Sequence, residues 1–463
     1  MGEGLNLDLQ AASQAFGGRW LNGPPQTLIQ RVQTDSRQVQ PGDLFVALKG
    51  ARFDAHAFLP QVMAAGAAAA MVSAVDPALL LPQWVVKDTR AGLGSLAAWH
   101  AQQLNTRRVA VTGSNGKTSV KEMLAQVLSR VGDTLATQGN LNNDIGVPLT
   151  LLRLRAHHRF AVIETGANHV GEIARLGQWV RPEGGIITQA APAHVGEFGG
   201  LHAIVRAKGE LIDTVQPGGW IVLNRDSTGF AYWYSRARQR SLAIYTFGRH
   251  ADVQVRIASV QQRRGGLEGV LDVSGEQLPF SLPLWGLHHA HNLAAVVAAV
   301  RAMGLSATAA IEALMGFRGA PGRMQPIALR GGGVLMDDSY NANPASVRAA
   351  VETLIRTGAP VAVCLGALAE LGEESEVIHA ELGRWLAEQG VQALWTFGQG
   401  AAPAATAFGA HGSLHEDHAA VGEAVAAWLA AHPQGMVLVK GSRSAAMERV
   451  IEYLRSEHAD LFD

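Results

Sequence analysis

The stretch "VTGSNGKTSVKEML" (residues 111–124) combines glycine, lysine and hydroxyl side chains in the manner of phosphate-binding loops. It follows an apolar run, "RRVAVTG", and precedes a segment with apolar residues at helical spacing, which places the loop at a helix N-terminus. Free backbone N–H groups attract anions there, while Lys117 would contact outer phosphates and Thr118 would bind Mg²⁺. The predicted phosphate-binding loop comprises Gly113, Ser114, Asn115, Gly116, Lys117, Thr118 and Ser119.

The loop departs from the usual spacing in one respect. A standard phosphate loop has a glycine five residues before Gly116, and Val111 occupies that position. This difference disfavours a standard kinase or GTPase and indicates a variant loop.

Further polar residues follow later strands. Glu164 ends an apolar strand and would either share a metal with Thr118 or lie in solvent. His194 follows the next strand in a turn-rich loop and, on its own, is typical of a surface histidine. Lys208 lies on an expected helix, where a solvated lysine is the ordinary interpretation. The polar "NLNND" segment offers Asn140 and Asn142 for substrate binding or for capping of a loop.

Strand and helix patterns alternate almost throughout the 463 residues, which predicts an α/β protein of about three domains. The glycine-rich segment "GAPGR" (residues 319–323) indicates a linker. Four strand–helix units follow it and predict a small doubly wound domain. The expected domains span residues 1–88, 89–319 and 320–463.

Composition narrows the function classes. With 38 basic and 39 acidic residues, the formal net charge is −1, which favours neither nucleic acid nor an anionic membrane as partner. Cys364 is the single cysteine, so no intrachain disulfide can form. The N-terminal residues lack a basic leader and an apolar signal region, and the longest apolar runs are too short to span a bilayer. We therefore expect a cytoplasmic protein without membrane insertion.

The motifs, taken together and in order, carry a resemblance. They are "TGSNGKTS", "TQGNLNNDIGVPLTLL", "IETGANHVGEI", "APAHVGEFG", "AKGEL", "GLHHAHNLAA", "PGRMQ", "DDSYNANPAS" and "VLVKGSRSAAME". This set resembles the Mur ligases of peptidoglycan synthesis over essentially the whole chain, and the variant phosphate loop is normal in that family. The resemblance implies a small N-terminal α/β domain for the UDP-substrate, a central ATPase with a parallel sheet, and a C-terminal Rossmann-like domain.

The family resemblance also implies an activity. "DSYNANP" followed by "KGSR" is most similar to the family member that uses ATP to join D-alanyl-D-alanine to UDP-N-acetylmuramoyl-tripeptide. That reaction passes through an acyl phosphate, and we expect a monomer. The alternatives are the ligase that adds the third residue, which typically has "DYAHTP", and a folylpolyglutamate-synthase-like ligase, which has "DGAHNP". A nucleotide-dependent regulatory protein on the same fold would lack one of Lys117, Glu164, His194 or Lys208, and all four are present.

The resemblance assigns roles by motif position. It makes Lys117, His194 and Lys208 catalytic, with Thr118 and Glu164 as ligands of the Mg²⁺ bound to ATP. Glu164, His194 and a carbamylated Lys208 would hold a second Mg²⁺. Further ATP contacts would come from Asn292, Arg323 and Asp338, and substrate contacts from Ser36, Arg37, Asn140, Asn142, Asn341, Asn343, Lys440, Ser442 and Arg443. The chain departs from the family pattern at His289, Ala367 and Ser227.

Overall fold

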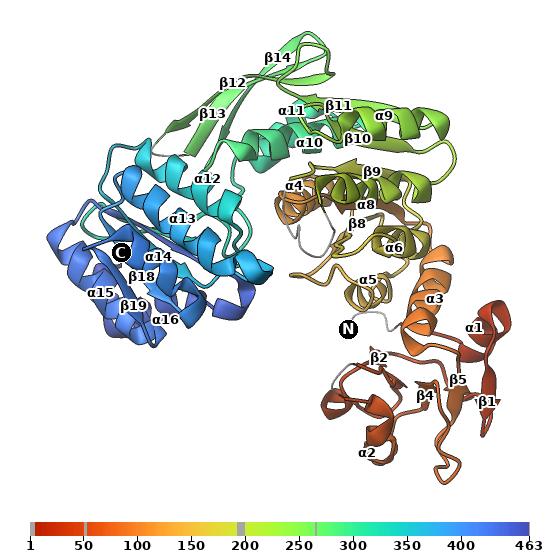
Figure 1. Cartoon of the computed structure of the whole chain (residues 1–463). Helices are drawn as coiled ribbons and strands as arrows, with labels where there is room; N and C mark the ends of the chain where they lie inside the picture. Colours follow the sequence, from red (N-terminus) through yellow and green to blue (C-terminus); the bar gives the residue numbers. More distant parts are fainter. Residues whose placement is uncertain (1–4, 51–52, 192–199, 264–265, 463) are drawn as a thin grey trace.

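Three β-sheets of five, nine and six strands follow one another along the chain (Figure 1). They are seen in a computed structural model that describes residues 5–50, 53–191, 200–263 and 266–462. The predicted α/β class is confirmed. The exact domain boundaries, at residues 88/89 and 319/320, stay predictions.

The N-terminal sheet has the strand order β1-β5-β4-β3-β2. Its strands run parallel except for β1, which pairs with β5 in the antiparallel sense. The elements of this region are α1 (Leu9–Phe16), β1 (Arg19–Leu21), β2 (Val32–Gln33), η1 (Ser36–Gln38), β3 (Leu44–Val46), η2 (Ala55–Phe58), α2 (Leu59–Ala64), β4 (Ala69–Val72) and β5 (Gln83–Val85).

The central sheet has the order β14-β13-β12-β11-β10-β9-β6-β8-β7 and is parallel from β7 through β12. Strands β12 to β14 form an antiparallel extension that the sequence patterns did not predict. The strands are β6 (Arg107–Thr112), β7 (Thr134–Ala136), β8 (Phe160–Glu164), β9 (Gly184–Ile187), β10 (Trp220–Asn224), β11 (Ala243–Gly248), β12 (Val255–Arg263), β13 (Gly266–Val273) and β14 (Glu276–Leu282).

Helices cover both faces of the central sheet, and its parallel strands are therefore apolar on both sides. On β6, Val109 and Val111 belong to one core and Ala110 to the other, as the period of two in a strand requires. One core receives α4 (Lys117–Ser129), α10 (His288–Ala302) and α11 (Ala307–Leu314). The other receives α3 (Thr89–Gln102), α5 (Gly146–Leu151), α6 (Glu172–Val180), α8 (Leu201–Thr214) and α9 (Phe230–Gln239).

Helix α3 joins the N-terminal and central sheets through close contacts on two of its faces. A side chain at Gly92 would collide with Met71 of β4, and one at Gly94 would collide with Trp179 of α6. The hydroxyl of Thr89 donates a hydrogen bond of 2.9 Å to the carbonyl of Ala47 beside β3. A single apolar core consequently runs from the N-terminal sheet through α3 into the central sheet.

The C-terminal sheet contains more strands than expected. Its order is β15-β16-β20-β17-β18-β19, whereas the sequence patterns predicted four strands. Both missed strands are short edge strands: β15 (Gln325–Ala328) is antiparallel and contains Pro326, and β19 (Gly412–His415) lacks an apolar run. The other strands are β16 (Val334–Asp338), β17 (Val361–Gly366), β18 (Ala393–Phe397) and β20 (Met436–Lys440).

Two helical layers enclose this sheet, as in other doubly wound folds. One layer comprises α12 (Pro344–Ile355), α13 (Ser375–Glu388) and α14 (Ala402–Phe408), and the other comprises α15 (His418–Ala431) and α16 (Glu448–Glu457). Short helical turns complete the chain: η3 (Gly372–Glu374), η4 (Gln399–Ala401), η5 (Arg443–Ala445) and η6 (Ala459–Leu461).

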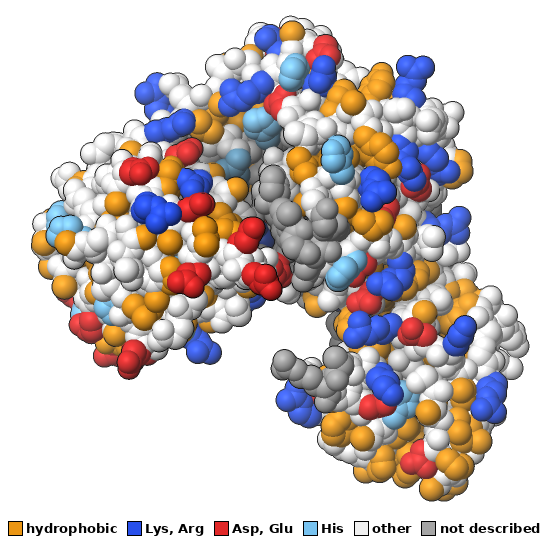
Figure 2. Space-filling view, in the orientation of Figure 1, with side chains coloured by type: hydrophobic (Ala, Val, Ile, Leu, Met, Phe, Trp, Pro, Cys, Tyr) orange, Lys and Arg blue, Asp and Glu red, His pale blue; other side chains and the backbone are white. Residues whose placement is uncertain are grey.

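The surface facing the viewer in Figure 2 carries basic and acidic side chains interspersed over all three regions. Along the described ranges, each helix falls short of the length and apolar character that a bilayer-spanning segment needs.

Candidate active site

The predicted phosphate loop lies between β6 and α4. Helix α4 begins at Lys117, and Gly116 before it has a positive φ of 82°. The ammonium of Lys117 donates hydrogen bonds of 2.8 Å to the Gly113 carbonyl and 3.2 Å to the Ser114 carbonyl. Burial lowers the pKa of Lys117, which Glu164 opposes and Arg323 reinforces. The loop therefore combines free N–H groups with a lysine that is held at the helix start.

Two glycines of the loop permit approaches that a side chain would block. At Gly113, with φ of 146°, a Cβ atom would stand 1.9 Å from the hydroxyl oxygen of Thr188. At Gly116, it would stand 2.6 Å from the side-chain oxygen of Asn292. The backbone of the loop is thus packed directly on the end of β9 and on α10.

Glu164 lies at the end of β8, beside β6, and contacts the first turn of α4. The Thr118 hydroxyl donates a hydrogen bond of 2.9 Å to one carboxylate oxygen, and the Asn142 amide donates one of 2.8 Å to the other. Glu164 is 2% exposed, so the solvated strand-end carboxylate, which was the alternative interpretation, is excluded. Hydroxyl and carboxylate oxygens are the donors that Mg²⁺ prefers.

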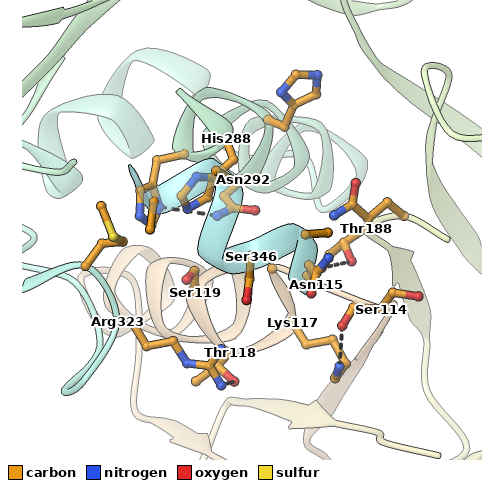
Figure 3. A pocket seen from close by; sticks show the side chains of 18 of the residues that line it. Ser114, Asn115, Lys117, Thr118, Ser119, Thr188, His288, Asn292, Arg323 and Ser346 are labelled. Carbon is orange, nitrogen blue, oxygen red and sulfur yellow. Dashed lines mark hydrogen bonds between the residues drawn. The ribbon is translucent and has the colours of Figure 1, made fainter. Parts of the chain in front are cut away.

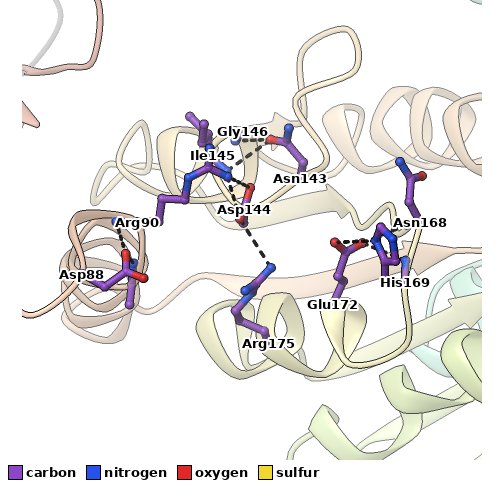
Figure 4. A network of polar contacts seen from close by, with 11 residues as sticks. Asp88, Arg90, Asn143, Asp144, Ile145, Gly146, Asn168, His169, Glu172 and Arg175 are labelled. Atoms are coloured by element: carbon purple, nitrogen blue, oxygen red, sulfur yellow. Dashed lines mark hydrogen bonds and ion pairs between the residues drawn. The ribbon is translucent and has the colours of Figure 1, made fainter. Parts of the chain in front are cut away.

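The residues that follow Asn142 hold its segment in place through further polar contacts. Asn143 accepts hydrogen bonds from the N–H groups of Ile145 and Gly146 and so acts as a cap (Figure 4). Asp144 forms ion pairs with Arg90 at 3.3 Å and Arg175 at 3.4 Å. The loop therefore connects α3 and α6 to the carboxylate of Glu164.

A cavity of about 540 Å³ opens beside the phosphate loop, between the central and C-terminal sheets. Arg323 donates a hydrogen bond of 3.2 Å to the Thr118 hydroxyl (Figure 3). The guanidinium of Arg323 also lies 4.2 Å from the centre of the Tyr340 ring. Predicted site residues that line the cavity are Ser114, Asn115, Gly116, Lys117, Thr118, Ser119, Asn292, Arg323, Asp338, Asn341, Asn343 and Lys440.

Lys440 and Asp338 form a buried ion pair on adjacent strands, β20 and β16. The Lys440 ammonium lies 2.6 Å from a carboxylate oxygen of Asp338 and also donates a hydrogen bond of 2.9 Å to the Asn341 carbonyl. Burial raises the pKa of Asp338, and the charge of Lys440 opposes that rise. The pair fixes the segment 338–341 at the cavity wall.

The start of α10 contributes the exposed His288, the buried His289 and the buried Asn292. The Asn292 amide lies 3.3 Å from Nδ1 of His289. Burial lowers the pKa of His289 well below its usual value, so this imidazole is neutral near pH 7. His289, where the family pattern has Asn, therefore still offers Asn292 a hydrogen-bonding partner.

The other two departures also have structural contacts. The Ser227 hydroxyl accepts a hydrogen bond of 3.0 Å from the Ala190 N–H, and the Ala367 carbonyl accepts a hydrogen bond from the Ser442 hydroxyl.

Lys208 lies on α8, as expected, but is 3% exposed, so the interpretation as a solvated surface lysine is wrong. Its ammonium donates a hydrogen bond of 3.4 Å to the Ala167 carbonyl. Burial, reinforced by the charge of Lys117, lowers the Lys208 pKa from 10.5 to about 7. His194 lies outside the described residues.

Several predicted substrate residues stand apart from the cavity lining. Ser36 and Arg37 lie on η1 of the N-terminal region, where Arg37 pairs with Asp35 at 2.8 Å. The remaining members are Asn140, Asn142, Ser442 and Arg443, of which Arg443 pairs with Glu448. Asn343 does line the cavity, but its side chain also caps α12.

The sequence reasoning missed Thr188 and Asp226, which line the same cavity. Thr188 donates a hydrogen bond of 2.6 Å to the Asn115 carbonyl of the phosphate loop. Asp226 accepts hydrogen bonds from the Arg249 N–H and lies 2.9 Å from a ring nitrogen of His291. Both residues follow the carboxyl ends of strands in the parallel sheet, where ligands bind in such folds. The same argument singled out Glu164 from the sequence, and it could have singled out these two residues.

Comparison with known proteins gives concordant matches. Family models match at residues 28–101 (Mur ligase family, catalytic domain), 111–300 (Mur ligase middle domain) and 322–443 (Mur ligase, glutamate ligase domain). The UDP-N-acetylmuramoyl-tripeptide–D-alanyl-D-alanine ligase of Escherichia coli (strain K12) is 41% identical, over 97% of this chain and 99% of that protein.

Solved structures agree with these matches. A crystal structure of MurF from Acinetobacter baumannii has a TM-score of 0.90 at 37% identity, with 98% of this chain and 99% of that chain covered. The MurF ligase from Thermotoga maritima in complex with ADP has a TM-score of 0.80 at 26% identity, with 92% and 97% covered.

The packing of the phosphate loop predicts a strong effect of Gly113→Ala. A left-handed conformation costs a non-glycine residue about 1–2 kcal/mol, and overpacking against Thr188 adds about 1–3 kcal/mol. Gly218→Ala is the matched control, because Gly218 also has a positive φ of 75° but open space around it. Urea unfolding should show a loss for Gly113→Ala exceeding that of the control by at least about 1 kcal/mol. Equal losses would contradict the close contact with β9.

Proposed function

This chain belongs to the Mur ligase family, and on that premise we propose that it joins D-alanyl-D-alanine to UDP-N-acetylmuramoyl-tripeptide with ATP. The products are the UDP-N-acetylmuramoyl-pentapeptide precursor of peptidoglycan, ADP and phosphate. One observation carries the proposal: Lys117, at the start of α4, lines a single cavity together with Asp338, Asn341 and Asn343 of the "DSYNANP" segment. That segment distinguishes this activity from the others of the family.

The chemistry requires activation of a carboxylate, because its oxygen is a poor leaving group. Transfer of the γ-phosphoryl group of ATP to the tripeptide carboxylate gives an acyl phosphate and ADP. The amine of D-alanyl-D-alanine then attacks the carbonyl carbon, and the tetrahedral intermediate expels phosphate and loses a proton. Lys117 and Arg323 offset the charge that gathers on the phosphates in the first step.

The residues around Glu164 fit a magnesium ion. Thr118 and Glu164 would hold it, because Mg²⁺ typically takes one or two carboxylates together with substrate phosphates. The ion would neutralise phosphate charge and orient the γ-phosphoryl group. Within the described ranges, no three His, Cys, Asp or Glu side chains are grouped so that they could hold a metal ion by themselves.

We further propose that Lys208 is carbamylated and, with Glu164 and His194, holds a second Mg²⁺. A lysine ammonium has no lone pair for a metal, whereas its neutral amine reacts with CO₂ to give a carbamate and a proton. The carbamate carries two oxygen ligands and a negative charge. The burial of Lys208 and its pKa, lowered to about 7, support this role, since a substantial fraction of the amine is neutral at physiological pH.

The ends of the large substrate require separate sites. We assign the uridine end to the N-terminal region, with Ser36 and Arg37, and the reacting end to Asn140, Asn142, Asn341, Asn343, Lys440, Ser442 and Arg443. The contacts of Asn292 and Asp338 at the cavity support their assignment to ATP. The enzyme would act as a cytoplasmic monomer.

The direct test of the function is phosphate release from ATP with purified protein. Release should require both UDP-N-acetylmuramoyl-tripeptide and D-alanyl-D-alanine, and mass spectrometry should detect the pentapeptide product. The dipeptide precursor with a free third amino acid, and a folate with glutamate, test the two alternatives. Turnover with either of these sets but not with the first would overturn the proposal.

Lys117→Ala should abolish ligation, because it removes the cation nearest the phosphate loop. We expect turnover to fall by at least about 1,000-fold, in line with the loss of a preorganised group that stabilises transition-state charge. Lys87→Ala, which removes an exposed lysine outside the cavity, is the control and should retain full activity. Thermal unfolding should be similar for both variants. Near-normal turnover by folded Lys117→Ala would refute the assignment of the ATP site.

Lys208→Ala should lose most activity, and short carboxylic acids should restore part of it by occupying the place of the carbamate. Because the pKa of Lys208 is lowered to about 7, the reactive neutral amine predominates above that pH and is lost below it. With dissolved CO₂ held constant, the carbamate signal of ¹³CO₂-treated protein should therefore decline as pH falls through 7. A Lys208→Ala enzyme with full activity in CO₂-depleted buffer would exclude the carbamate.

A further inference from the structure

Helix α4 carries a second lysine, Lys121, whose side chain is fully buried one turn after Lys117. Its ammonium donates a hydrogen bond of 2.8 Å to the Thr137 carbonyl and also contacts the carboxylate of Glu122. Burial of an ammonium group is costly unless hydrogen bonds and a counter-charge compensate it. An apolar side chain at this position would be buried at a lower cost in free energy. The role of Lys121 therefore lies in its hydrogen bond to Thr137 and in the contacts that Thr137 makes in turn.

Thr137 directly follows β7 and is 1% exposed. Its N–H donates a hydrogen bond of 3.1 Å to the Val162 carbonyl of β8. The register of β7 and β8 ends at Ala136 opposite Val162, two residues before Glu164. The Thr137 hydroxyl instead accepts a hydrogen bond of 2.9 Å from the Glu164 N–H. A side chain thus continues the hydrogen bonding of the strands where β7 stops.

Glu164 is therefore held at its backbone as well as at both carboxylate oxygens. The oxygens accept hydrogen bonds from Thr118 and Asn142, at 2.9 and 2.8 Å. Thr118 and Lys121 lie on the same helix, three residues apart, which places them on neighbouring positions of one face. Lys121, Thr137 and Glu164 consequently connect α4 to the end of β8 by a second route besides the Thr118 contact.

We propose that Lys121 and Thr137 are positioning residues that fix Glu164 against the first turn of α4, so that Thr118 and Glu164 are arranged in advance for Mg²⁺. This inference rests on the proposed use of Mg²⁺ with ATP and adds residues that would contact neither ion nor nucleotide. Residues behind metal ligands typically change metal affinity by about 10–100-fold when they are replaced.

The test measures ADP binding to the full-length protein by calorimetry, with millimolar Mg²⁺ and with EDTA. Thr137→Val removes the hydroxyl but retains the shape of the side chain, and Thr137→Ser restores the hydroxyl. Thr134→Val is the matched control, because Thr134 begins the strand that Thr137 follows and its hydroxyl donates a hydrogen bond of 2.8 Å to the Gly132 carbonyl, away from Glu164. Lys121→Met tests the same connection from the helix.

We expect Thr137→Val and Lys121→Met to weaken ADP binding in Mg²⁺ by about 10-fold or more, with a change of less than about twofold in EDTA. Thr137→Ser and Thr134→Val should retain the Mg²⁺ effect. The inference is overturned if folded Thr137→Val keeps the full Mg²⁺ effect, or if Thr134→Val loses as much. Wild-type binding that does not depend on Mg²⁺ would overturn the proposed metal site together with this inference.

Discussion

The hydrogen bond between Thr118 and Glu164 joins a region that favours anions, at the start of α4, to a carboxylate that favours cations. The start of α4 favours anions, because its N–H groups are free and Lys117 stands beside them. Glu164 favours cations. Their proximity follows from the adjacency of β6 and β8, whose carboxyl ends reach the same edge of the parallel sheet. A metal ion bound to a polyphosphate needs a carboxylate for the cation next to N–H groups for the phosphates. The loops around the cavity are therefore arranged about this contact between Thr118 and Glu164.

The second half of the cavity comes from a different sheet. Arg323 reaches the Thr118 hydroxyl from the segment between the central and C-terminal sheets, and the Lys440–Asp338 pair holds the opposite wall. Neither sheet alone provides a complete set of cations and oxygen ligands. Movement of the C-terminal region relative to the central sheet would therefore assemble or dismantle the site, which suits a reaction whose acyl phosphate must be kept from water.

The sequence allowed prediction of those features that depend on local pattern. The phosphate loop, the strand that ends at Glu164 and the helix of Lys208 were all predictable from periodicity and turn residues. The edge strands β15 and β19 were not, because tertiary pairing rather than an apolar run determines them. The helical pattern around Lys208 does not by itself indicate burial, since the burial depends on helices brought together from distant parts of the chain.

Long-range contacts account for the other omissions. Lys121 has the sequence pattern of an ordinary exposed helical lysine. Its hydrogen-bond partner, the Thr137 carbonyl, lies beside it only because β7 packs next to α4 in the folded chain. Thr188 reaches the phosphate loop from β9, 73 residues away from Asn115. Such contacts form only when the strands pair in the folded sheet. They cannot be predicted from the spacing of residues along the chain.

The continuous core through α3 has a geometrical consequence for substrate choice. Gly92 and Gly94 let this helix pack tightly on Met71 and Trp179, so one continuous core connects the N-terminal sheet to the central sheet that carries the phosphate loop. On the proposal that the uridine end binds the N-terminal region, this shared core would set the distance from that end to the phosphate loop. A peptide one residue shorter or longer would then present its carboxylate at a different distance from the phosphate loop, so peptide length would be a criterion of substrate choice.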